Sequence, residues 1–89
     1  MKTKKFMNFY DYCVKSHYGE NSPAGDFVMD MKDSKDFPKS TNNTPYPSGL
    51  YKQNIIDYLE KHNADYRCYK ILDNLWDEYA KAAIDFIYP

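Results

Sequence analysis

Two cysteines and two histidines are the residues of this chain best suited to metal binding or nucleophilic chemistry. Cys13 and His17 are four residues apart, which places both side chains on one face of a helix, where they could bind the same metal ion. His62 and Cys68 could supply two further ligands. Alternatively, His17 could act as a base that activates the Cys13 thiol as a nucleophile.

Neither type of chemistry is supported by a recognisable motif. Structural zinc sites usually combine short ligand pairs, and the spacing of these four residues matches none of them. Cys13 falls on an apolar helical stripe, which is typical of a small core residue. The sequence has no Gly-rich phosphate loop, no paired-carboxylate motif and no Gly-x-Ser-x-Gly. We therefore expect a protein that is not an enzyme and has no metal site or cofactor.

Tyrosine is the unusual feature of the composition, with ten in the chain. Five of them lie off the apolar stripes or in expected loops: Tyr12, Tyr18, Tyr46, Tyr66 and Tyr69. A tyrosine ring buries a large area at low entropic cost while its hydroxyl forms a hydrogen bond, so tyrosine is enriched at binding hot spots. The pattern makes Tyr12, Tyr66 and Tyr69 candidates for contacts to a partner protein, and codon bias with packing along helix edges explains it equally well.

Charge is nearly balanced, with 12 Lys and Arg against 13 Asp and Glu, so no global field attracts nucleic acid or membranes. Asp73 and Asp77 contribute to a negative face on the last predicted helix, which could attract a basic protein surface. The positive candidates are an N-terminal arm and the single arginine, namely Lys2, Lys4, Lys5 and Arg67. They would carry direct DNA or RNA binding in an alternative function.

Four amphipathic segments position these residues, each with apolar side chains at helical spacing. The first carries Phe6, Phe9, Tyr10, Cys13 and Val14 and ends near Gly19. The second carries Ala24, Phe27, Val28 and Met31 and ends before Phe37-Pro38. Ser22 followed by Pro23 is typical of a helix start, because serine caps the free N–H groups and proline tolerates the first position.

Residues 38–47 hold three prolines among Ser, Thr and Asn residues, which predicts a long loop. Ser48 is expected to cap the third helix, whose stripe is Tyr51, Ile55, Tyr58, Leu59 and His62, and Asn63 to end it. The last helix starts near Asp65 and buries Leu72, Leu75, Trp76, Tyr79, Ala83 and Phe86. It should form the spine of the bundle, with residues 1–4 and 88–89 fraying.

These patterns predict an all-α fold, a compact bundle of four to five helices in a single domain over residues 1–89. No segment shows the period-two alternation of a half-buried strand. No signal-peptide core and no apolar stretch near 18 residues is present, so we expect a cytoplasmic protein with reduced cysteines and no membrane contact.

Several short pieces resemble the YozE-like family in order and spacing. They are Asn8-Phe9-Tyr10-Asp11-Tyr12, Ser22-Pro23-Ala24-Gly25-Asp26, Asp36-Phe37-Pro38-Lys39-Ser40, Ile56-Asp57-Tyr58-Leu59-Glu60, Asn63-Ala64-Asp65-Tyr66 and Leu75-Trp76-Asp77-Glu78-Tyr79. The chain differs from the family pattern in a longer loop at 41–51 and in an extended tail at 81–89. The resemblance implies a small bacterial protein with a fold similar to sterile alpha motifs, without implying a catalytic residue, cofactor or substrate.

The leading hypothesis is therefore a non-catalytic protein–protein interaction module, a small subunit or adaptor in a larger bacterial complex. The alternative is a nucleic-acid-associated protein, which binds DNA or RNA directly or serves as an accessory subunit of a DNA-processing (replication) enzyme of a mobile element. Self-association is a further possibility, because sterile-alpha-motif-like domains can associate head to tail through unlike surfaces.

Overall fold

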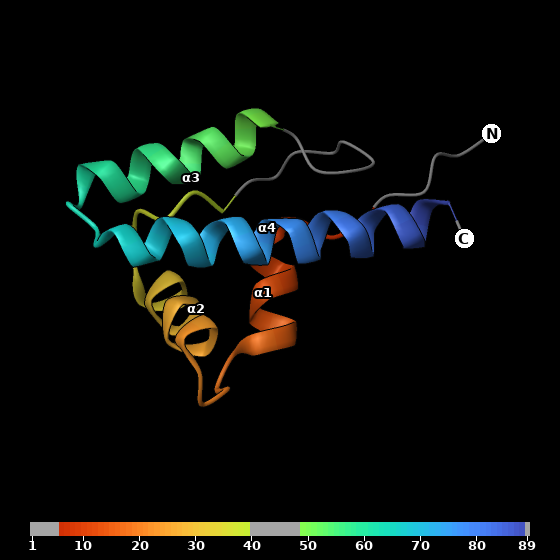
Figure 1. The fold of residues 1–89 in the computed structure, drawn as a ribbon, viewed down its shortest axis with the longest axis horizontal. Coiled ribbons are helices and arrows are strands. Elements are labelled where there is room, and N and C mark those ends of the chain that lie inside the picture. Colours follow the sequence, from red (N-terminus) through yellow and green to blue (C-terminus); the bar gives the residue numbers. More distant parts are fainter. Residues whose placement is uncertain (1–5, 40–48, 89) are drawn as a thin grey trace.

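The computed structural model describes residues 6–39 and 49–88, and all regular elements among them are helices. They are α1 (Phe9–His17), α2 (Pro23–Asp33), α3 (Gly49–Lys61) and α4 (Tyr66–Ile87). The expected all-α class and the helix number of four to five are thereby confirmed. Figure 1 shows α4 as the longest element, with α3 on one side of it and α1 and α2 on the other.

The first two helices begin at polar caps. The Asn8 side chain accepts a hydrogen bond from the Asp11 amide, and the Ser22 hydroxyl accepts one from the Gly25 amide, with Pro23 opening α2 as expected. Phe6 was predicted to lie within the first helix, but it precedes the Asn8 cap. Helical hydrogen bonding begins at the Asn8 cap, so Phe6 lies outside the helix. Its ring packs against the rings of Tyr79 and Phe86.

The turn between α3 and α4 is short. Asn63 adopts a positive φ of 51°, a conformation that ends a right-handed helix. Asp65 then caps α4, its side chain accepting a hydrogen bond from the Arg67 amide. Ser48, predicted to cap the third helix, lies outside the described residues, as do residues 40–47 of the predicted loop, residues 1–4 and Pro89 of the predicted frayed ends. Tyr88 is the C-cap of α4, with its amide bonded to the Ile84 carbonyl.

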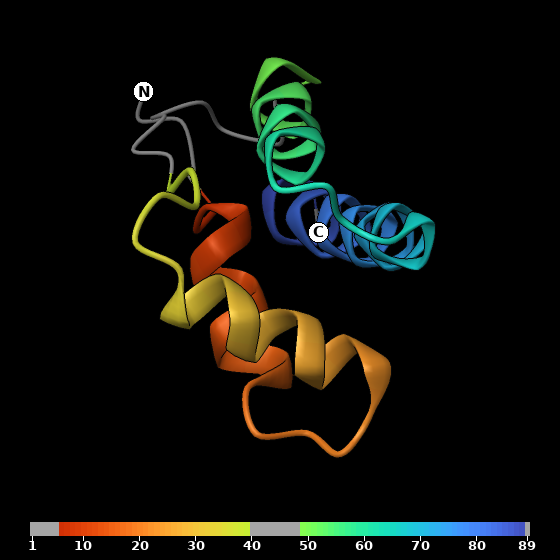
Figure 2. The ribbon, with the colours of Figure 1, turned by 90° about the vertical axis from the view of Figure 1, so that its left-hand side faces the viewer.

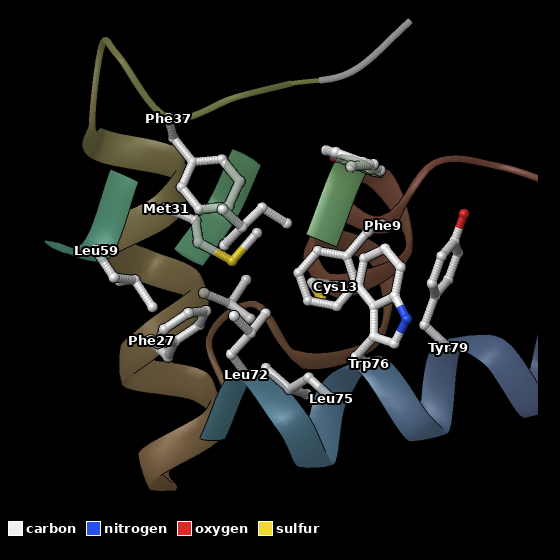
Figure 3. Packing of buried hydrophobic residues seen from close by; sticks show 13 residues of the cluster. Phe9, Cys13, Phe27, Met31, Phe37, Leu59, Leu72, Leu75, Trp76 and Tyr79 are labelled. Atoms are coloured by element: carbon white, nitrogen blue, oxygen red, sulfur yellow. The ribbon is translucent and has the colours of Figure 1, made fainter. Parts of the chain in front are cut away.

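Apolar side chains from all four helices and from Phe37 form one core (Figure 3). Phe9, Cys13, Val28, Ile55 and Leu72 are its most fully buried members. Two predicted stripe residues are exceptions. Phe86 is 48% exposed, because α4 runs beyond the end of the bundle, and His62 is exposed at the turn after α3.

Helix α4 is the spine that organises the other three. Its 22 residues span about 33 Å at about 1.5 Å per residue. α1 and α2 pack against each other and against α4, whereas the only helix whose backbone comes close to α3 in the described chain is α4, to whose N-terminal half α3 is antiparallel (Figures 1 and 2). Within the described helices, no Cα atom of α2 lies within 8 Å of a Cα atom of α3. The space between these two helices is therefore bridged by side chains alone.

Candidate interaction surface

Two neighbouring hollows lie where α2 faces the turn between α3 and α4. One has a volume of about 240 Å³ and the other about 310 Å³, and both are lined by Phe27, Asp30 and Cys68. Met31 and Leu59 line the first hollow, and Ile71 lines the second. We call this continuous depression the α2–α4 groove, defined by Phe27, Asp30, Met31, Leu59, Cys68 and Ile71. Its floor is apolar, and both hollows are open to solvent along their length.

The groove follows from helix spacing and side-chain size. The backbones of α2 and α3 stay apart, and small side chains at Ala64 and Cys68 leave the space between them unfilled. Phe27, Met31 and Leu59 are buried beneath it, and each of these residues is at most 7% exposed. Ala64, Cys68 and Ile71 are only partly buried. A partner that covered the groove would therefore bury apolar surface that is exposed to solvent in the free chain.

Carboxylates line the rim of the groove on the α2 side. Asp26 and Asp30 are one helical turn apart, both exposed, and within the described part of the chain neither has an ion-pair partner. On the opposite rim, the Arg67 guanidinium lies 3.3 Å from the Asp65 carboxylate, so these two charges largely compensate each other. The lining of the second hollow holds three carboxylates against one guanidinium, an excess of negative charge that favours a cationic partner.

A polar network closes one end of the groove. The Tyr58 hydroxyl donates to the Ser34 hydroxyl, which donates to the Asp36 carboxylate, and that carboxylate lies 2.8 Å from the His62 imidazole. The hydrogen bonds from His62 and then Ser34 hold the pKa of Asp36 below its usual range. This network ties the segment after α2 to α3 and so fixes the width of the groove at that end.

A second polar cluster joins α1 to α4 on another side of the molecule. One Glu78 carboxylate oxygen lies 2.8 Å from the Tyr12 hydroxyl and 2.8 Å from His17 Nε2, while His17 Nδ1 lies 2.6 Å from Glu20. Burial lowers the pKa of His17, but hydrogen bonds to Glu20 and Glu78 outweigh it and raise the pKa overall. Burial, followed by the bond to Glu78, raises the pKa of Tyr12 to about 12.

The candidate cysteine chemistry finds little support in this geometry. Cys13 is fully buried, and burial together with the nearby Glu78 charge raises its pKa to about 12. Both ring nitrogens of His17 face carboxylates, and His62 pairs with Asp36. Cys68 lies in the wall of the groove. Among residues 6–39 and 49–88 no group of three or more such side chains is arranged to hold a metal ion.

The three tyrosines predicted to contact a partner occupy different environments. Tyr66 is the most exposed, at 76%, and it opens α4 between Asp65 and Arg67, which line the second hollow. Tyr69 is partly buried against the core. Tyr12 is also partly buried, with its ring 5.6 Å from that of Tyr79 and its hydroxyl bonded to Glu78. Only Tyr66 therefore presents most of its surface to solvent.

The charged candidates are likewise separated by the fold. Asp73 forms an ion pair with Lys52 of α3 at 3.0 Å, whereas Asp77 is exposed one turn further along α4. Arg67, which was predicted to contact nucleic acid in the alternative function, forms an ion pair with Asp65. Lys2, Lys4 and Lys5 lie outside the described residues. The structure thus brings Arg67 to the second hollow, leaves Tyr66 exposed next to it in the chain, and places Asp73 and Asp77 on a different stretch of α4.

The sequence interpretation did not single out Asp26 and Asp30 as candidates, nor the pairing of His17 with Glu78. The spacing of Asp26, Asp30 and Asp33 at i, i+4 and i+7 is a signal that could have indicated an acidic stripe along the second helix. No local pattern could have indicated which core surface the stripe borders, because the groove depends on where α3 and α4 pack.

These features define a class: a small all-helical bundle with an open, acidic-rimmed apolar groove. The family model of the YozE SAM-like fold matches residues 8–81, and the chain belongs to that family, as its sequence motifs predicted. Residues 82–89, most of the predicted tail extension, continue beyond the match. Comparison with curated proteins and with solved structures found no significant match. Within the described chain, no helix combines the length and hydropathy needed to cross a membrane.

Proposed function

We propose that this protein is a non-catalytic protein–protein interaction module, a small subunit or adaptor of a larger bacterial complex. The observation that carries the proposal is the α2–α4 groove, an apolar depression left open beside the most exposed tyrosine of the described chain. Apolar surface rimmed by polar groups is typical of interaction sites. Tyr66 adds the kind of side chain that dominates binding hot spots.

Charge favours a protein over a nucleic acid as the occupant of this surface. The carboxylates on the rim of the groove would repel a phosphate backbone, and the one arginine is paired with Asp65. A non-catalytic role is supported by the side chains that could do chemistry. Cys13 is buried with a raised pKa, and the His17 imidazole is held between two carboxylates.

The proposal is tested by recovering the tagged chain from its native cell, with and without nuclease, and identifying the proteins bound to it. If Tyr66 is a hot spot, Tyr66→Ala should reduce the binding free energy of the partner by about 1–3 kcal/mol and so lower its recovery, while helicity stays unchanged. Tyr69→Ala tests the half-buried neighbour. Tyr88→Ala, 66% exposed at the opposite end of α4, is the matched control and should have no effect.

Two results would argue against the proposal, and a third would move the interaction to a different surface. Recovery that depends on nucleic acid would favour the DNA- or RNA-associated alternative, and its strong salt dependence would indicate direct phosphate contact. A single species of higher mass in light scattering, with no other protein bound, would indicate self-association instead. Equal recovery with Tyr66→Ala, Tyr69→Ala and wild type would show that the partner uses another surface.

A further inference from the structure

The size of the groove determines what kind of group it can accept. Small-molecule sites usually have volumes of roughly 300–1,000 Å³. The hollows of about 240 and 310 Å³ are at or below the lower end of that range, and they are open to solvent instead of enclosed. Each hollow suits the apolar side chains of a peptide segment better than a whole organic ligand. Because the two share Phe27, Asp30 and Cys68, one continuous segment can reach both.

The arrangement of charge determines the chemistry of that segment. Asp26 and Asp30 are on one face of α2, about 5–6 Å apart at their Cβ atoms as i, i+4 neighbours. No cation of the described residues neutralises them, whereas the carboxylates of Asp36 and Asp65 face His62 and Arg67. Two adjacent positive charges on a partner would therefore meet two uncompensated carboxylates beside an apolar floor.

We infer that the α2–α4 groove binds a basic amphipathic segment of the partner protein. Its apolar side chains occupy the two hollows over Phe27 and Cys68, and its Lys or Arg side chains pair with Asp26 and Asp30. This inference rests on the proposed function and adds the chemistry of the partner to it. An acidic or uncharged segment would leave both rim carboxylates facing an apolar contact, which costs free energy when they are desolvated.

Cys68 provides a direct reporter of occupancy, because it lies in the walls of both hollows. The chain has one other cysteine, Cys13, which is fully buried and which reacts only if the bundle unfolds. The rate at which N-ethylmaleimide alkylates Cys68, followed by mass spectrometry with peptide mapping, therefore measures access to the groove. Alkylation of Cys13 in the same sample reports loss of the fold.

The experiment uses the purified full chain and two synthetic probes of about 14 residues, roughly four helical turns. One is an amphipathic Leu/Lys peptide and the other its Leu/Glu counterpart. The Leu/Lys peptide should slow alkylation of Cys68 about tenfold at a concentration about ten times its Kd, and the Leu/Glu peptide should not. Raised salt should weaken the protection, because the ion pairs at the rim are partly exposed.

Charge reversal tests whether the rim of the groove is responsible. Asp26→Lys/Asp30→Lys should lose protection by the Leu/Lys peptide and gain it from the Leu/Glu peptide. Asp77→Lys/Asp85→Lys, which reverses two exposed carboxylates of α4, should behave as wild type. Since Asp26 lies in the first turn of α2, its reversal could unfold that helix, and Asp30→Lys alone then provides the same test with a smaller expected shift.

Two outcomes would overturn the inference. One is protection of Cys68 by the Leu/Lys peptide that is unchanged in Asp30→Lys. The other is protection that appears with rising concentration of the chain alone, which would identify a second copy as the occupant. The proposed function is judged separately. If a native partner is recovered but Cys68 stays fully reactive in the complex, the protein is an interaction module whose partner does not occupy the groove. If the Leu/Lys peptide protects Cys68 but no native partner is recovered, the groove binds basic segments and the proposed interaction module is contradicted.

Discussion

The imidazole of His17, in the last turn of α1, lies 2.8 Å from the carboxylate of Glu78 in the middle of α4. The two residues are 61 positions apart in the chain, and the contact joins the N-terminal helix to the spine of the bundle. His17 also contacts Glu20 in the turn after α1, so its ring bridges three elements of the chain. Protonation of this single ring therefore affects how α1 is held against α4.

Replacement of His17 by glutamine should destabilise the protein in a pH-dependent way. The folded-state pKa of His17 lies above its ordinary value of 6.5, so the folded chain holds this proton more tightly than the unfolded chain. The resulting stabilisation is fully present below about pH 6.5 and is lost as pH rises through the raised pKa. Urea unfolding should show a deficit of about 1 kcal/mol for His17→Gln near pH 6 that shrinks near pH 8.5. An equal deficit at both pH values would contradict the role of the charge.

The two thiols should differ sharply in reactivity in the free protein. Cys13 is fully buried and its pKa is raised to about 12, so it carries almost no thiolate near neutral pH. Cys68 is partly buried in the wall of the groove. We expect one thiol per chain to react with a disulfide reagent near pH 8 and both to react in concentrated urea. Rapid reaction of Cys13 in the folded chain would show that α1 does not stay packed against α2 and α4.

Substitution of Gly25 by alanine should destabilise the protein, although alanine favours helices by about 1 kcal/mol over glycine. A Cβ atom at this position of α2 would overlap the Glu20 carbonyl oxygen and lie 2.7 Å from its carbonyl carbon. That group belongs to the backbone of the preceding turn, so relief requires a shift of the chain that costs about 1–3 kcal/mol. Thermal melts should give a lower Tm for Gly25→Ala. A higher Tm would mean that the turn moves freely.

Truncation of the core should have a much larger effect than truncation of the exposed part of α4. Leu72 is 1% exposed within the core, whereas Ile84 is 50% exposed on the same helix. Leu72→Ala should cost about 2–5 kcal/mol, a large share of the roughly 5–15 kcal/mol that stabilises a typical domain. Ile84→Ala should change the free energy of unfolding by about 0.5 kcal/mol or less. Urea titrations of both variants would compare them directly.

The boundaries of the helices could largely be predicted from the sequence, because they depend on groups a few residues apart. Ser22 caps α2 through the amide of Gly25, as predicted, and α4 begins beside Asp65, where its start was expected. The buried stripes of α2 and of most of α4 were likewise predicted, since helical periodicity places those side chains on one face. Phe6 and Phe86 were assigned wrongly, because the position of a cap and the end of the bundle limit where a stripe can be buried.

The sequence by itself thus determined four helices, the Ser22 cap of α2 and most of the residues that the helices bury. Only the tertiary structure decided that α2 and α3 stand apart and leave a groove, that Asp26 and Asp30 form its rim, and that His17 meets Glu78. The physical reason is the distance along the chain over which each kind of interaction acts. Capping and periodicity act within one or two helical turns, whereas a groove or an ion pair between helices depends on packing between segments far apart in the chain.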